Sequence, residues 1–214
     1  MQLNQYIDHT SLKAVATPGD IIQLCKEAKK HQFYAVCVNG SYVRLAGEAL
    51  KGSGVKVAAV IGFPLGAMDT RSKIFEAREC TASGADEIDM VINIGELKDG
   101  NLKFVEDEIS EIKKAIGTKV LKVIIETCYL TEDEKIAACK CALNAKADFV
   151  KTSTGFGSGG ATFEDVKLMK SIVGDKLQVK ASGGIKDAET AANYIKLGAS
   201  RLGTSSGIFI ISKS

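Results

Sequence analysis

The sequence predicts an α/β fold in which eight parallel strands close into a (β/α)8 barrel. Short apolar runs alternate along the whole chain with amphipathic stretches that carry helix-start signals. Such alternation is typical of a parallel sheet with helical crossovers, and eight is the number of strands in a closed barrel. An open, doubly wound sheet would explain the alternation equally well, but not the polar residues that follow several strands. The expected strands are residues 6–10, 35–38, 57–61, 87–92, 120–125, 149–152, 177–181 and 201–203.

Four helix starts are explicit in the segments between these strands. Thr17-Pro18-Gly19-Asp20 combines an N-cap residue with a proline in the first turn and an acid that can complete a capping box. Residues 131–134 (Thr-Glu-Asp-Glu) form a second capping box, and residues 162–165 (Thr-Phe-Glu-Asp) form a looser one. Asp187 should cap a helix that runs through Lys196 and ends before a glycine.

Composition limits the class of protein. A length of 214 residues fits a single domain spanning residues 1–214. With 28 basic and 26 acidic residues, the net charge of +2 argues against a nucleic-acid or membrane partner. We find neither a signal-peptide pattern nor a long apolar run, so we expect a cytoplasmic protein whose six cysteines stay reduced. Two histidines make a His-built metal site improbable, and we expect no metal.

Ionisable residues interrupt strands that should be almost wholly apolar. Asp89, Lys122, Lys151 and Lys180 each lie within or at the end of such a run. An unpaired buried charge costs several kcal/mol, so each must be paired, neutralised or facing a wet cavity. In barrel enzymes the catalytic groups come from the C-terminal ends of strands, where Lys151 and Lys180 lie.

These charges do not all have the same interpretation. For Lys122, a structural ion pair and a functional role remain equally good. For Lys151 and Lys180, each followed by a loop of small residues, a functional role is favoured. Mutual repulsion and burial would both lower a lysine pKa and leave a free amine, which attack on a carbonyl requires.

Three late loops are rich in glycine and serine: residues 153–160, 182–185 and 203–207. Glycine lets backbone N–H groups approach an anion, and helix starts add a favourable dipole. The last two loops follow the seventh and eighth expected strands, where barrels often bind phosphate. Together with the neighbouring Lys186, they predict a phosphate site.

Several segments together resemble the deoxyribose-phosphate aldolase family. Residues 149–156 (FVKTSTGF) look like its Schiff-base strand, and residues 180–186 (KASGGIK) look like its second-lysine strand. The two lysine motifs are specific as a pair, and the resemblance covers nearly the whole chain. Further similarity lies in residues 7–10, 37–38, 62–66, 84–91, 122–127 and 203–206.

The resemblance implies a class I aldolase that joins acetaldehyde and glyceraldehyde 3-phosphate as 2-deoxyribose 5-phosphate, or splits that sugar. Lys151 would form the imine, Lys180 would lower the pKa of Lys151, and Asp89 would shuttle protons through a water. The imine is the electron sink, so no cofactor is implied. The expected partners are therefore a phosphorylated sugar and aldehydes, and a homo-oligomer stays open as an alternative to a monomer. The substrate pocket would include Asp8, Thr10, Cys37 and Thr152, and phosphate would bind near Gly155, Gly183, Gly184, Lys186, Gly203, Ser205 and Ser206.

The chain departs from some family members in two places. Phe156 stands where they have a lysine, so backbone dipoles and Lys186 must meet the phosphate charge. The sequence also lacks the longer C-terminal tail of some relatives. Two other classes remain as alternatives: a phosphate-binding barrel isomerase or synthase, which has no use for the paired lysines, and a non-catalytic binding module.

Overall fold

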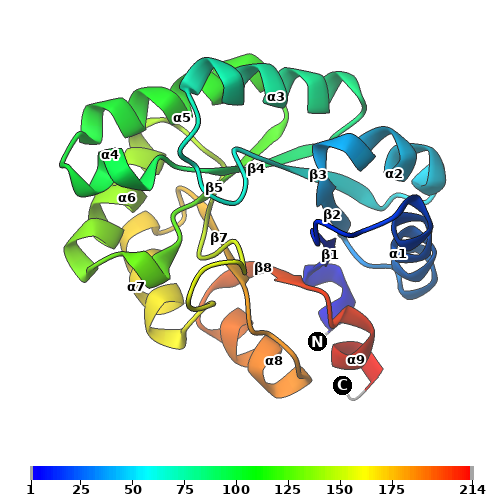
Figure 1. Ribbon diagram of the computed structural model, residues 1–214. Coiled ribbons are helices and arrows are strands. Elements are labelled where there is room, and N and C mark those ends of the chain that lie inside the picture. The colour runs from blue at the N-terminus through cyan, green and yellow to red at the C-terminus, as the bar shows by residue number, and fades with distance from the viewer. Residues whose placement is uncertain (1, 213–214) are drawn as a thin grey trace.

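The computed structural model describes residues 2–212 and forms a closed barrel of eight parallel strands surrounded by helices (Figure 1). The strands follow one another in chain order, and β8 pairs with β1 to close the barrel. This closure rules out the open, doubly wound alternative. The strands are β1 (Ile7–Ser11), β2 (Ala35–Asn39), β3 (Lys56–Ile61), β4 (Glu87–Val91), β5 (Val120–Ile124), β6 (Phe149–Lys151), β7 (Gln178–Ser182) and β8 (Ala199–Thr204).

Helices cover the outside of the barrel, and the helix starts expected from the sequence are confirmed. Thr17 and Thr131 each form a complete capping box, with Asp20 and Glu134 respectively. Thr162 and Asp187 each accept a hydrogen bond from a backbone N–H in the first turn of their helices. The α-helices are α1 (Pro18–His31), α2 (Val43–Leu50), α3 (Thr70–Ala82), α4 (Ile94–Lys98), α5 (Leu102–Ile116), α6 (Glu132–Asn144), α7 (Phe163–Val173), α8 (Ala188–Lys196) and α9 (Gly207–Ser212). Short 3-10 helices cover Leu3–Tyr6, Gly40–Tyr42 and Thr127–Tyr129.

The period-2 geometry of each strand separates two environments. Outward side chains such as Val36, Ile88 and Val123 are buried against the helices in the main hydrophobic core. Inward, Cys37 and Val60 belong to a small apolar cluster on the β2–β3 side. Asp89 is the register partner of Val60, so it faces the same interior. The rest of the interior carries ionisable side chains, which form the site described below.

A second buried ion pair lies among the helices. Lys73 of α3 donates to Glu108 of α5 at 2.9 Å and to the backbone oxygen of Val91 at 2.9 Å. Both side chains have no exposed surface. The pair therefore fixes α3 and α5 to the end of β4. Among residues 2–212, no helix combines the length and the apolar character needed to cross a membrane.

Candidate active site

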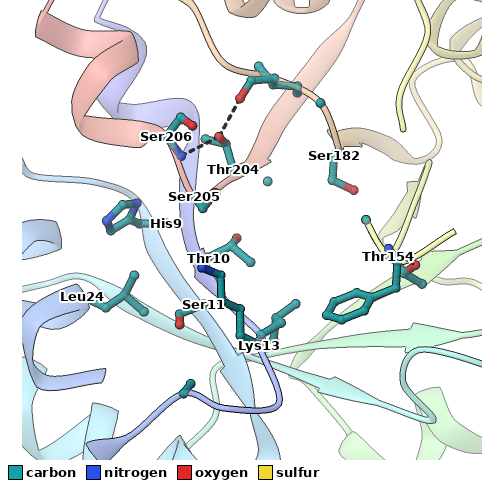
Figure 2. Close-up of a pocket in the computed structure, with 18 of the residues that line it drawn as sticks. His9, Thr10, Ser11, Lys13, Leu24, Thr154, Ser182, Thr204, Ser205 and Ser206 are labelled. Atoms are coloured by element: carbon teal, nitrogen blue, oxygen red, sulfur yellow. Dashed lines mark hydrogen bonds between the residues drawn. The ribbon is translucent and has the colours of Figure 1, made fainter. Parts of the chain in front are cut away.

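A pocket of about 790 Å³ opens at the C-terminal ends of the strands, with β1, β6, β7 and β8 and the loops after them forming its wall. Figure 2 shows Thr10, Thr154, Ser182 and Ser205 around one open space. The structure brings most of the residues expected from the sequence to this wall. Those that line it are Thr10, Lys151, Gly155, Gly183, Gly184, Lys186, Gly203, Ser205 and Ser206.

Five other expected residues are buried and are not part of the pocket wall: Asp8, Cys37, Asp89, Thr152 and Lys180. None of them has exposed surface. Thr152 exchanges two hydrogen bonds of 3.1 Å with the backbone of Ser182, so it joins β6 to β7. Asp8, Asp89 and Lys180 belong to an ionic network behind Lys151.

Lys151 and Lys180 lie side by side on β6 and β7 as register partners. Both donate to the same carboxylate oxygen, Asp89 Oδ2, at 2.9 Å and 2.8 Å. Lys180 also donates to Asp8 Oδ2 at 2.5 Å. Lys151 is thus the lysine at the pocket wall, and Lys180 is enclosed between two carboxylates.

The pKa values of the two lysines are shifted in opposite directions. Burial lowers the pKa of Lys151, and the neighbouring Lys180 charge lowers it further, against the pull of Asp89. Burial would also lower the pKa of Lys180, but Asp8 and Asp89 together raise it above its ordinary value. Sequence reasoning expected repulsion and burial to lower the pKa of one lysine of the pair, Lys151, and Lys180 to keep its charge. The structure adds the reason that Lys180 stays protonated, which is its pairing with two carboxylates.

The carboxylates are held ionised by the same network. Burial opposes the charged form of Asp89, but Lys122, Lys151 and Lys180 hold its pKa well below the usual value. Burial likewise opposes ionisation of Asp8, yet Lys180, Arg201 and Lys122 bring its pKa to about 2. A carboxylate at either position is therefore a permanent negative charge near neutral pH.

Sequence reasoning did not assign a role to Glu87 or Arg201, although both interrupt strands as Asp89 does. Arg201 donates to Asp8 Oδ1 at 2.8 Å and pairs with Glu87 at 3.1 Å, and its guanidinium lies 3.5 Å from the centre of the Tyr34 ring. Lys122, whose role the sequence left open, pairs with Glu87 at 2.5 Å and with Asp89 at 2.7 Å. These contacts favour the ion-pair interpretation of Lys122.

The last two glycine loops are joined by one side chain. Thr204 Oγ1 donates to the backbone oxygen of Ile185 at 2.7 Å and accepts from the Ser206 backbone N–H at 2.9 Å (Figure 2). Gly183 and Gly184 have φ of +85° and +82°, where a side chain would be strained. Thr204 therefore holds the loop after β7 beside the loop after β8. Together the two loops form an edge of the pocket that consists of small residues.

Gly203 was expected to be glycine so that phosphate could approach the backbone, and the structure gives a different reason. A Cβ at this position would lie 2.9 Å from the Ser182 Cβ and 3.1 Å from the Lys180 Cε. It would therefore meet the side chains of two β7 residues. The requirement for glycine comes from the packing of Ser182 and Lys180 against β8.

Further contacts hold the walls in and beside the pocket, and sequence reasoning gave no role to Glu126 or His9. Glu126 is buried and accepts hydrogen bonds from the N–H and the hydroxyl of Thr154, which holds the loop after β6. Phe156 lines the mouth and packs edge-on against Phe63, with ring centres 5.4 Å apart. His9 lies at the other end of the pocket and bonds to Glu27 at 2.7 Å. Among residues 2–212, no group of side chains could hold a metal ion.

Comparison with known proteins agrees with a lysine-centred barrel. The family profile "DeoC/LacD family aldolase" matches residues 3–212. The chain is 60% identical over 211 residues to a deoxyribose-phosphate aldolase from Bdellovibrio bacteriovorus, covering 99% of this chain and 96% of the relative.

Solved structures give the same result. One described as "QR15, an Aldolase" superposes with a TM-score of 0.95 at 44% identity, covering 98% of this chain and 94% of the other. The deoxyribose phosphate aldolase from Aeropyrum pernix, described as a tetramer, superposes with a TM-score of 0.90 at 31% identity, covering 98% and 89%. The barrel, its interior lysines and these matches over nearly the full length show that this chain belongs to the DeoC/LacD aldolase family.

Proposed function

We propose that this protein is a class I aldolase that reversibly cleaves 2-deoxy-D-ribose 5-phosphate into acetaldehyde and D-glyceraldehyde 3-phosphate. The observation that carries the proposal is the contact of both lysines with Asp89 Oδ2, together with pKa values that are shifted in opposite directions. Lys151 lies at the pocket wall with a lowered pKa, and Lys180 stays charged 2.8 Å from the carboxylate oxygen that Lys151 also contacts. A neutral amine beside a proton donor is the arrangement that imine formation needs.

In the cleavage direction, the neutral Lys151 amine attacks the C1 aldehyde of the open-chain sugar and forms a carbinolamine. Lys180 donates a proton to the leaving hydroxyl, so that water departs and an iminium remains. The iminium carries its positive charge at Lys151 Nζ, which lies 2.9 Å from Asp89 Oδ2. Asp89 therefore stabilises the iminium as it would stabilise an ammonium ion.

In the bond-cleavage step, Lys180, which is now neutral, acts as the base. Lys180 takes the proton of the C3 hydroxyl while the C2–C3 bond breaks, which gives glyceraldehyde 3-phosphate and a neutral enamine on Lys151. Protonation of the enamine at C2 and addition of water release acetaldehyde and restore both lysines. Asp89 contacts both amines, so we assign to it the relay of protons between them, with a water completing the path to substrate.

The phosphate is assigned to the edge of the pocket formed by the loops after β7 and β8. Backbone N–H groups near Gly183, Gly184, Ser205 and Ser206 would receive it, and Lys186, which is exposed and lines the pocket, would supply a positive charge. Gly155 lies on the facing loop after β6. Phe156 supplies no positive charge on this wall. The groups that neutralise the phosphate charge must therefore come from the loops after β7 and β8.

The setting of the enzyme is proposed on separate grounds. Cys25, Cys37, Cys80, Cys128, Cys139 and Cys141 are all free thiols. Free thiols persist in a reducing compartment, which supports a cytoplasmic location. Self-association is supported by the relative from Aeropyrum pernix that is described as tetrameric. Light scattering of the purified chain tests it.

The test of the proposed function is chemical trapping. The protein is incubated with acetaldehyde, reduced with borohydride and digested, and mass spectrometry identifies the lysine that gains an ethyl group. We expect one stoichiometric adduct on Lys151 and none in Lys151→Leu. A phosphate-binding isomerase or synthase would give no adduct, and an adduct on another lysine would reassign the nucleophile.

A further inference from the structure

Seven ionisable side chains form one connected cluster inside the barrel. Each is buried, and Arg201, at 4%, is the most exposed of them. Hydrogen bonds or ion pairs of 3.1 Å or less connect all of them. The cluster consists of the carboxylates Asp8, Glu87 and Asp89 and the basic residues Lys122, Lys151, Lys180 and Arg201.

The cluster has one more basic group than acidic groups. If all seven were ionised, three negative charges would face four positive charges, which leaves a buried surplus of +1. A buried charge without a partner costs several kcal/mol, and a titratable group commonly loses its charge instead. The surplus is therefore relieved when one of the basic groups gives up its proton.

The contacts decide which group gives up the proton. Arg201 cannot deprotonate in a protein. Lys180 pairs with two carboxylates, Asp8 and Asp89, and Lys122 pairs closely with Glu87 and Asp89. Lys151 has one carboxylate partner, Asp89. Lys151 is thus the basic group that loses least by becoming neutral.

One neighbouring thiol has to be considered beside this count. The groups that act most strongly on Lys151 are Asp89 on β4, Lys180 on β7 and Cys37 on β2. Burial raises the pKa of the Cys37 thiol, so that it stays neutral near pH 7. The balance of charge around Lys151 is therefore set within the seven-residue cluster.

Arg201 is the member of the cluster whose charge is fixed. Among the described residues its ion pairs are with Asp8 and Glu87, so it adds a permanent positive charge to carboxylates that the lysines also use. We propose that Arg201 is a positioning residue for the aldolase reaction. Its positive charge neutralises part of the carboxylate charge in the cluster, and this holds Lys151 in its neutral, nucleophilic form. It touches no substrate and acts through Asp8, Lys180 and Asp89. This inference rests on the proposed function of Lys151.

The proposal gives opposite expectations for two substitutions. Arg201→Met leaves three carboxylates for three lysines, so Lys151 can keep its proton. Glu87→Gln leaves two carboxylates for four basic groups, so Lys151 loses its proton more easily. The double variant Arg201→Met/Glu87→Gln removes one charge of each sign and returns the surplus to +1.

The experiment measures the rate of borohydride-trapped acetaldehyde adduct against pH, using the full chain. For Arg201→Met we expect the midpoint of the profile to move up by about one pH unit, which makes trapping at neutral pH about tenfold slower. For Glu87→Gln we expect the midpoint to move down. The double variant should return close to the wild-type midpoint, and Arg201→Lys, which keeps the positive charge, should stay near it.

A merely structural role for Arg201 would lower the amount of folded protein without moving these midpoints. If Arg201→Met does not fold, the downward shift of Glu87→Gln and the restoration in the double variant still decide the question. Unshifted midpoints in folded variants overturn the proposal. If the wild-type protein traps no adduct on Lys151, the proposed function fails instead, so the two failures are distinguishable.

Discussion

Lys151 and Lys180 donate to the same oxygen atom of Asp89, although they come from different strands and their pKa values are shifted in opposite directions. Their register pairing on β6 and β7 places both amines within 2.9 Å of Asp89 Oδ2. One carboxylate oxygen thus lies between an amine with a raised pKa and an amine with a lowered pKa. A proton can pass between the two lysines without leaving the network, because the same acceptor contacts both.

Removing the second lysine should shift the pH dependence of the first. Lys180→Leu takes away a positive charge that lowers the pKa of Lys151. Because the folded-state pKa of Lys151 then rises, its neutral fraction at pH 7 falls and is recovered only at higher pH. We expect trapping with acetaldehyde to persist but slow, with its midpoint moved upward. An unchanged profile would contradict the coupling, and Lys180→Arg, which keeps the charge, is the matched control.

Asp89→Asn should separate imine formation from turnover. The variant keeps the shape of the side chain but removes a negative charge that stabilises the protonated form of Lys151. The trapping midpoint should therefore move to lower pH. Turnover should nevertheless fall by about 10²-fold or more, the usual scale for a positioned acid–base group.

Steady-state cleavage of deoxyribose 5-phosphate and single-turnover trapping measure the two effects on the same Asp89→Asn protein. Asp175→Asn, at a fully exposed carboxylate, controls for the loss of an acid. Near-normal turnover of folded Asp89→Asn would leave Asp89 with a charge-balancing role alone.

Lys186→Gln should weaken phosphate recognition and leave the chemistry intact. Lys186 is exposed on the edge of the pocket, next to the loops that Thr204 joins. Loss of one exposed charge should raise the KM for deoxyribose 5-phosphate by about fivefold, in keeping with about 1 kcal/mol for a charge-assisted contact. The effect should shrink at high salt.

Cleavage of unphosphorylated deoxyribose is the internal control for Lys186→Gln, and its kcat/KM should not change. Lys196→Gln, at the far end of α8, is the matched surface variant. Equal losses with both sugars would mean that Lys186 supports the loop and not the phosphate.

The Lys73–Glu108 pair should affect the free energy of unfolding and leave the charge balance around Lys151 unchanged. Lys73→Met leaves the buried Glu108 without its cation, and breaking a buried pair costs about 3–5 kcal/mol. Replacing both partners, as Lys73→Met and Glu108→Leu together, removes the unpaired charge and should recover most of that loss. Denaturant unfolding of the three proteins measures the difference. A double variant no more stable than Lys73→Met would indicate that the hydrogen bonds to Val91 and Thr70 dominate.

Local signals in the sequence predicted the framework because each element depends on its own residues. Apolar runs gave the strands and the capping boxes at Thr17 and Thr131 gave two helix starts, since both are decided within a few positions of the chain. The contact that keeps Lys180 charged could not be found this way. It involves Asp8, which is 172 residues away along the chain.

The same limit applies to the role of individual glycines. From the sequence, Gly203 was interpreted as a point of approach for phosphate, because it follows the last strand. The structure shows that its missing side chain makes room for Ser182 and Lys180, which come from the neighbouring strand. Glu87 and Arg201 could have been found, because the rule that identified Asp89 applies equally to both.

The pairing of Asp8 on β1 with Arg201 on β8 links catalysis to completion of the fold. The two residues are separated by 193 positions, and they meet only when the last strand docks beside the first. Until then Asp8 lacks its Arg201 partner, and the charge balance that frees the Lys151 amine does not exist. During synthesis, an amino-terminal portion with six or seven strands formed would therefore contain the nucleophile in an inactive, protonated form. If Lys151 is the nucleophile, its reactivity toward aldehydes would begin only when β8 has paired with β1.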